Sequence, residues 1–177
     1  MEPATTGAPD PDRQAAEGFR RELIGVLLRF KAGDFGVRMA ADHTGLDGKI
    51  ADALNDILAV NEQRANEATR VSRAVGRAGK LKERMSVPGA VGGWAADVRA
   101  LNTLIDDLVW PTTEVTRAIG AVAKGDLGQA MSLDVEGRPL EGEFLRSAQL
   151  VNSMIDQLSV FTSEVTRVAR EVGTEGK

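Results

Sequence analysis

The sequence predicts an all-α protein of stacked parallel four-helix coiled-coil bundles, each completed by a second copy of the chain. In every unit a helix, an extended connector and a second helix follow one another. Three observations lead to this prediction. The 177 residues are 42% hydrophobic, 27% charged and only 4% aromatic, a composition typical of long helices. The sequence also repeats about every 46 to 50 residues, and apolar residues within each repeat recur at alternating spacings of four and three.

The N-terminal tail, residues 1–18, is rich in Pro and Ala, and we expect it to be disordered. It lacks the charged and apolar segments of a signal peptide. No apolar run in the chain approaches the ~18 to 20 residues of a membrane span. We therefore expect a soluble, cytoplasmic segment that does not insert into a membrane, in a parent protein that is free to be membrane-associated.

Three related segments mark the connectors that follow the first helix of each repeat. AGDFGVRM, AGKLKERM and KGDLGQAM end at Met39, Met85 and Met131, which are 46 residues apart. This regular recurrence predicts that the methionines anchor the connectors on the bundle. Phe35 and Val37 alternate with Met39 along the chain, which indicates an extended segment with one buried side. The third repeat alternates in the same way at Leu127, Met131, Leu133 and Val135.

The helices carry a coiled-coil seam, in which apolar or small residues recur every 3.5 residues on average. Thr112 and Thr162 interrupt this otherwise aliphatic series. They are either tolerated there, or they hold the bundle near balance between two packings. The predicted bundle core consists of Leu54, Leu58, Leu101, Ile105, Leu108, Thr112, Val115, Ile119, Val122, Val151, Ile155, Leu158, Thr162 and Val165.

The connector length sets the direction of the second helix. About 14 extended residues, such as 34–47, reach about 45 Å. A helix of 16 residues is only about 24 Å long, so the connector can return along it and start a parallel helix. Two parallel helices with one seam each cannot bury both seams alone. We therefore expect a parallel homodimer, with an antiparallel monomeric bundle as the alternative.

Neighbouring repeats are expected to join through continuous helices, because no Gly or Pro interrupts residues 53–75 or 151–172. Pro111 is the exception and predicts the start of a helix. Unequal spacings of 46 and 47 indicate a residue gained or lost near Gly79 and Gly125, which changes coiled-coil winding. After the tail, the predicted units are 19–66, 67–111, 112–162 and a truncated fourth, 163–177. This fourth repeat stops at Lys177, which predicts that the chain is a piece of a longer protein.

The composition argues against catalysis, cofactors, metals and nucleic acid. The chain has no Cys, and its one histidine, His43, lies in a polar connector where we expect an ordinary surface residue titrating near ~6.5. The net charge of −4 disfavours nucleic-acid binding, so the basic run 70–84 is read as a solvated helix face. GAVGG at 89–93 lacks the Gly-Lys-Ser/Thr sequel of a phosphate loop. We read Asp106, Asp107, Glu141 and Glu143 as surface charge.

This repeat resembles the HAMP domain from about Phe19 to Lys177. The resemblance is carried by GDL-like helix ends, by KGDLGQAMSLDV, and by a hydrophobic–Asn–x–hydrophobic signature in ALN, ALN and LVN. It implies that Pro111 opens a first helix, and that first helices close at Gly33, Gly79 and Gly125.

The resemblance further implies a parallel homodimer without catalytic activity. Such a module relays conformational signals between sensor and histidine-kinase domains of the same chain in two-component phosphorelay signalling. It binds no small-molecule ligand or cofactor. Two alternatives remain: a passive coiled-coil dimerisation spacer, or the relay segment of a methyl-accepting chemoreceptor.

Overall fold

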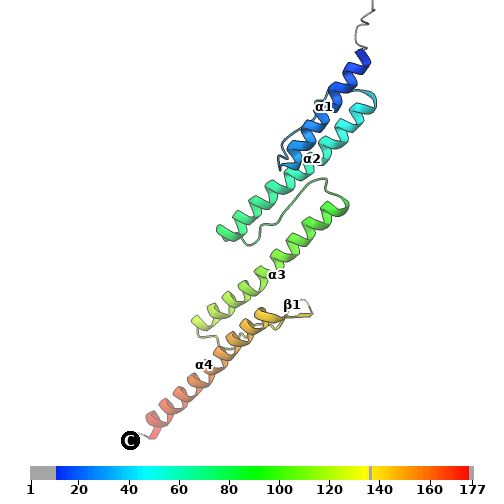
Figure 1. The fold of residues 1–177 in the computed structure, drawn as a ribbon. Coiled ribbons are helices and arrows are strands. Elements are labelled where there is room, and N and C mark those ends of the chain that lie inside the picture. Colours follow the sequence, from blue (N-terminus) through cyan, green and yellow to red (C-terminus); the bar gives the residue numbers. More distant parts are fainter. Residues whose placement is uncertain (1–10, 136, 176–177) are drawn as a thin grey trace, which may run out of the picture. The chain divides into compact units, whose positions relative to one another are not determined.

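The computed structural model describes residues 11–135 and 137–175, which are mostly helical with little strand, so the predicted all-α class is confirmed. Contacts divide the chain into two compact units, Met1–Leu101 and Asn102–Lys177. The α-helices of the described part are α1 (Pro11–Lys31), α2 (Gly45–Val71), α3 (Gly92–Ala123) and α4 (Gly142–Glu175) (Figure 1). A π-helical segment, η1 (Ser72–Arg77), follows α2, and a short hairpin of β1 (Asp134–Val135) and β2 (Arg138–Pro139) precedes α4.

Helix α1 begins earlier than predicted. Residues 11–18, assigned to a disordered tail, form its first turns, and residues 1–10 of that tail lie outside the described residues. Proline suits the first position of a helix because its missing N–H would have no partner there, and Pro11 occupies that position. Arg13 and Glu17, one turn apart, form an ion pair of 3.5 Å that supports the added turns.

In the first unit α1 lies beside the N-terminal part of α2 and points the same way (Figure 1). The connector at 32–44 returns along the pair, as its length predicts. Val37 and Met39 are buried while Gly36 and Arg38 are exposed, which is the alternation expected of an extended segment with one buried side. The core of this pair is formed by Phe19, Val26, Val37, Met39, Ala51 and Leu58.

The second repeat accommodates one extra residue in its first helix. Glu67 and Gly79 are 12 residues apart, whereas the equivalent residues of the other two repeats are 11 apart. The surplus residue falls in η1, where the Ala78 N–H donates to the Arg73 carbonyl five residues earlier, at 3.0 Å. A π-turn absorbs a single inserted residue without ending the helix. The residue gained near Gly79 is therefore located in η1.

In the second unit the C-terminal part of α3 and the start of α4 point the same way (Figure 1). Met131, Leu140 and Ala148 form the buried cluster between them, with Trp110 and Leu145 packed against it. The longer third connector folds into the β1–β2 hairpin. Leu133, expected on the buried side, is exposed, because the chain turns there and the Leu133 carbonyl accepts the Leu140 N–H at 2.8 Å.

The predicted helix start at Pro111 is wrong. Pro111 lies inside α3, which continues from Gly92 to Ala123, and it is buried. A proline removes one helical donor and bends a helix, but it does not end the helix when packing holds both sides. Here Pro111 lines a cavity together with Leu140 of the third connector. The hydroxyl of Thr112 also bonds to the Leu108 carbonyl at 2.9 Å and reinforces this turn.

Candidate functional site

The first and third repeats fasten the connector with an asparagine from the second helix. The Met39 N–H donates to Asn55 Oδ1 at 2.8 Å, and Asn55 Nδ2 donates to the Met39 carbonyl at 3.1 Å. Asn152 binds Met131 in the same way, at 2.7 and 3.0 Å. One carboxamide thus satisfies both backbone groups of one residue, as a neighbouring β-strand would. We call this pair of hydrogen bonds the Asn–Met latch.

The latch explains two motifs that the sequence placed far apart. The methionine side chains are buried, 3% exposed at Met39 and 2% at Met131, as expected of connector anchors. Met85 is buried as well. Sequence reasoning noticed the recurring asparagines but gave them no role, because a hydrogen bond across 16 or 21 residues leaves no periodic signal. The available signal was that one polar residue recurs at a fixed place beside the predicted seam.

In the first repeat a glutamate of α1 holds the connector from the other side. Glu22 Oε1 accepts the Ala40 N–H at 2.7 Å, and Glu22 Oε2 lies 2.7 Å from His43 Nε2. The His43 ring meets the buried Phe19 edge-to-face, with 5.0 Å between centroids. The Ala40 N–H and then His43 lower the pKa of Glu22. His43 is therefore a half-buried contact residue and not the plain surface histidine that the sequence predicted.

The second repeat builds the same contact with an arginine. Glu67 Oε2 accepts the Ser86 N–H at 3.1 Å, while Arg70 pairs with Glu67 at 2.8 Å and with Glu83 at 2.7 Å. Arg70 also donates to the Arg84 carbonyl at 2.9 Å. The Arg70 guanidinium, followed by the Ser86 N–H, lowers the pKa of Glu67, and the two carboxylates raise the pKa of Arg70. Arg70, the first residue of the basic run, thus binds groups of its own chain. We call this set of contacts the arginine clasp.

The third repeat again uses a glutamate and an arginine one turn apart. Arg117 pairs with Glu114 at 2.9 Å and donates to the Ala130 carbonyl at 3.0 Å, next to Met131. In each repeat, therefore, a charged group of the first helix binds the connector backbone beside the anchoring methionine. The position three residues after the glutamate is arginine in the second and third repeats, but it is Gly25 in the first.

The three glycines at the helix ends all have positive φ, +91° at Gly33, +64° at Gly79 and +81° at Gly125. Glycine adopts this left-handed conformation without the steric cost that a Cβ brings. Each glycine lies just after the end of a helix, at Lys31, Arg77 and Ala123. In the first repeat the turn is completed by Asp34, which pairs with Arg29 at 2.6 Å; the Arg29 guanidinium lowers the pKa of Asp34.

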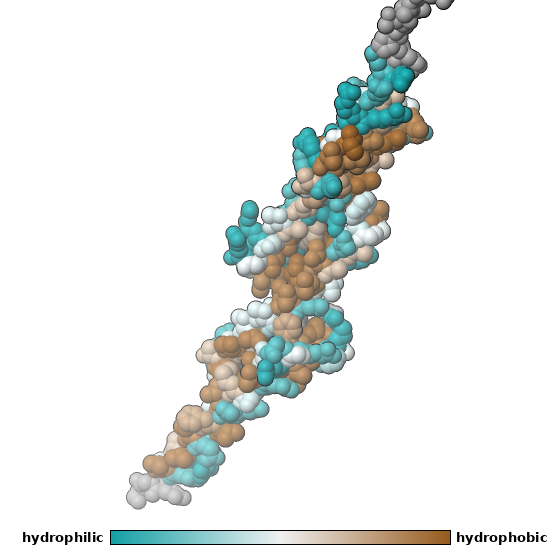
Figure 2. Space-filling view, in the orientation of Figure 1, coloured by the Kyte–Doolittle hydropathy of each residue, from teal (hydrophilic) through white to brown (hydrophobic). Residues whose placement is uncertain are grey.

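The residues predicted as bundle core differ widely in burial within one chain. Leu58 and Ile155, at equivalent positions, are buried. The half-buried members are Leu54, Ile105, Val115, Val122 and Val151. The exposed members are Leu101, Leu108, Thr112, Ile119, Leu158, Thr162 and Val165. Figure 2 shows apolar atoms at the visible surface of the helical segments.

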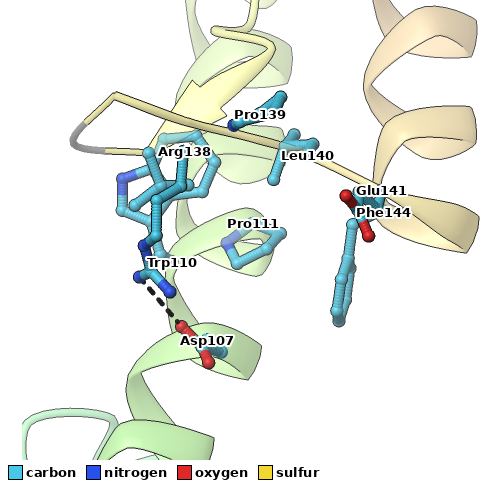
Figure 3. Close-up of a pocket in the computed structure, with 9 residues that line it drawn as sticks. Asp107, Trp110, Pro111, Arg138, Pro139, Leu140, Glu141 and Phe144 are labelled. Carbon is cyan, nitrogen blue, oxygen red and sulfur yellow. Dashed lines mark hydrogen bonds and ion pairs between the residues drawn. The ribbon is translucent and has the colours of Figure 1, made fainter.

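An open cavity of about 500 Å³ lies beside the third connector (Figure 3). Trp110 and Pro111 form one wall, and Phe144 lies across from them. Arg138 reaches from the hairpin and pairs with Asp107 at 3.4 Å, so these two charges are already matched. Apart from Asp107, Arg138 and Glu141, the lining is apolar. The cavity is lined by residues of α3, of the hairpin and of the start of α4, and it offers no set of groups for acid–base chemistry.

Within residues 11–135 and 137–175, no three His, Cys, Asp or Glu residues gather where they could hold a metal ion. Over the same ranges, no helix is both long enough and apolar enough to cross a lipid bilayer. The chain matches no family model and no solved structure. Its own contacts are therefore the basis for a functional proposal.

Proposed function

We propose that the chain is a non-catalytic signal-relay module of tandem HAMP-like units. It acts as a parallel homodimer in the cytoplasm, between a sensor domain and an output domain, most simply a histidine kinase of a two-component system. The proposal rests on an exposed apolar face. The helices that carry it are bound to their connectors on one side, and they expose apolar side chains on the other.

The bare face follows the predicted seam. On α3, Leu101, Leu108 and Ile119 are 41%, 49% and 50% exposed, although they lie at core positions of the 4-3 series. Helix α4 leaves Leu158 and Val165 exposed in the same series. Soluble proteins rarely leave a contiguous apolar surface of this kind without a partner. A second chain in parallel register would bring identical residues together and bury the seam.

The polar seam residues suit a bundle that has two packings. The hydroxyl of Thr112 donates to the Leu108 carbonyl at 2.9 Å, and that of Thr162 to the Leu158 carbonyl at 2.8 Å. Because each hydroxyl is satisfied within its own helix, threonine can face an apolar core at a small cost. A core of small and polar groups packs less tightly than an aliphatic one, which favours two states of similar free energy.

The latches and the continuous helices supply a mechanical path. The Asn–Met latch and the glutamate contacts tie the first helix, the connector and the second helix of one repeat to each other. Helix α2 continues through η1 into the second repeat, and α3 runs unbroken from Gly92 to Ala123. A rotation or shift in one repeat is thus passed on through the backbone to the next.

Disulfide cross-linking tests the dimer directly, because the chain has no native Cys. Leu108→Cys and Leu158→Cys place a thiol on the exposed part of the seam, and Thr103→Cys places one off the seam of α3. Seam cysteines of two parallel chains come within the ~3.5 to 4.5 Å between Cβ atoms that a disulfide needs. We expect efficient cross-linking of both seam variants, little for Thr103→Cys, and a mass near twice 18.8 kDa. A monomeric mass without cross-links would refute the dimer and the relay together.

Thr112→Ile distinguishes a relay from a passive spacer. The larger aliphatic side chain should stabilise one packing of the bundle. In a full-length receptor carrying this segment, a relay would then be locked in one output state, whereas a spacer would signal normally. If both thermal stability and signalling are unchanged, the relay is rejected.

A further inference from the structure

The contact between the first helix and the first connector is completed by a histidine, whereas arginines complete the contacts to the other two connectors. In the second and third repeats, Arg70 and Arg117 follow the glutamate by three residues and bind the connector backbone. The first repeat has Gly25 at that position, so its α1 offers no such cation. The connector itself supplies the missing donor, as His43 Nε2 lies 2.7 Å from Glu22 Oε2.

The geometry fixes the imidazole against the carboxylate. The Phe19 ring, 5% exposed, packs on the edge of His43 from α1. The backbone of His43 is closely packed as well, because Gly48 of α2 lies so near its carbonyl that an added Cβ would be 2.6 Å from the oxygen. The side chains of His43 and Glu22 are only 20% and 33% exposed, so solvent screens their interaction incompletely.

Glu22 is the charged group in contact with the ring. Neighbouring charged residues on α1, the connector and the start of α2 include Glu17, Arg20, Arg21, Arg38, Asp42, Asp47, Lys49 and Asp52. Among the described residues, none of these forms an ion pair or a hydrogen bond with His43, and Arg38 is engaged with Glu62 at 2.6 Å. The protonation of one imidazole therefore decides whether this contact is an ion pair or a neutral hydrogen bond.

We propose that the first connector is a pH-dependent clasp, tightest when His43 is protonated and Glu22 is ionised. A charge-assisted hydrogen bond is about twice as strong as a neutral one. Imidazole is the side chain whose charge ordinarily changes between about pH 5 and 8, so the clasp loosens as the pH rises through this range. The Ala40 N–H loosens with it, because the same carboxylate binds both groups. The second and third connectors, held by permanently charged arginines, do not respond in this range.

This inference concerns contacts within one chain and does not rest on the proposed relay. The test is amide hydrogen exchange of the full chain, corrected for intrinsic rates, at pH 5.5 and pH 8. We expect the protection of the Ala40 amide to fall about threefold to tenfold over this range. The Ser86 amide, held in the same way by Glu67 in the arginine clasp, is the internal control and should keep its protection.

Two variants decide the cause. His43→Gln keeps a neutral donor, so Ala40 protection should become independent of pH at the lower value. Gly25→Arg combined with His43→Gln is designed to rebuild the arginine clasp, and an added Cβ at Gly25 meets no atom within 4 Å. It should restore high protection at both pH values, and it keeps the test decisive if His43→Gln alone disturbs folding. Equal Ala40 protection at pH 5.5 and pH 8 in the unmodified chain, or a pH dependence that survives in His43→Gln, would overturn the proposal.

Discussion

The first and third connectors are held by the same pair of hydrogen bonds, although the two connectors differ in length. In the first, 16 residues separate Met39 from Asn55, and a short extended segment closes the distance. In the third, 21 residues separate Met131 from Asn152, and the surplus is folded into the β1–β2 hairpin. The two Asn–Met latches nevertheless agree to within 0.1 Å in both hydrogen bonds, at 2.8 and 3.1 Å against 2.7 and 3.0 Å.

This difference teaches which part of a connector is structurally required. The anchor is a buried methionine whose backbone is held by a carboxamide, and everything between the anchor and the second helix is free to vary in length. Surface loops tolerate such insertions at a small entropic cost. The contacts to the first helix vary as well, from a Glu–His pair in the first repeat to Glu–Arg pairs in the others.

The largest expected effect comes from the buried seam residues that the two repeats share. Leu58→Ala and Ile155→Ala should each lower the free energy of unfolding by about 2–5 kcal/mol, because each leaves a cavity. Urea denaturation followed by circular dichroism measures the change. Ile57→Ala, at a 40% exposed position one residue from Leu58, is the matched control and should cost clearly less. Equal costs at 57 and 58 would contradict the packing described for α2.

Removing the latch should weaken both connectors to a similar extent. Asn55→Ala and Asn152→Ala each delete two hydrogen bonds and leave backbone groups beside a buried methionine unsatisfied, at a cost of about 1–3 kcal/mol. The exchange rates of the Met39 and Met131 amides report the loss locally. Asn61→Ala is the control, since the hydrogen bonds of Asn61 join it to Ile57 and Arg64 of the same helix. If only one of the two latch variants released its methionine amide, the two connectors would not be equivalent.

The sequence predicted what is periodic and missed what is not. Alternation at Val37 and Met39 gave the extended connector and its buried side, and the connector length gave the parallel second helix. The latch at Asn55, the clasp at His43 and the hairpin at 134–139 depend on contacts between residues remote in sequence, which no local pattern reveals. Pro111 was misread because helix propensity is local, whereas the packing that keeps α3 intact around it is not.

Acid should release the glutamate contacts and spare the latches. The pKa of Glu22 and that of Glu67 are lowered by the groups they bind, so the stability they add is present above the ordinary carboxylate range. That stability is lost as the pH falls through the lowered values. Protection of the Ser86 amide should therefore drop only at pH values below the ordinary range of a glutamate, whereas the Met39 amide, held by a carboxamide, should not respond in the same way. Glu67→Gln should flatten the Ser86 profile, and an unaltered profile would refute the assignment.

The smallest effects are expected at two glycines: Gly25 lies inside α1, and Gly33 follows its end. Gly33→Ala should destabilise the chain by about 1 kcal/mol, because its φ of +91° strains any residue with a Cβ. Gly25→Ala should stabilise it by about 0.5–1 kcal/mol, since the position is an exposed helix interior with free space around it. Thermal denaturation of both variants resolves the difference in sign. Shifts in the same direction would contradict the backbone assigned to one of the two positions.

The π-turn at Ser72–Arg77 affects how the rotational orientation of one helix segment about its axis is passed on to the next repeat. One extra residue in an α-helix turns everything beyond it by about 100° about the axis. Taken up in a π-turn, the same residue widens one loop of the backbone and leaves the far end facing as before. Insertion of a residue is therefore a silent change at η1 but a large rotation elsewhere in these helices. A designer who joins such repeats in a new order can set their relative orientation by the choice between these two outcomes.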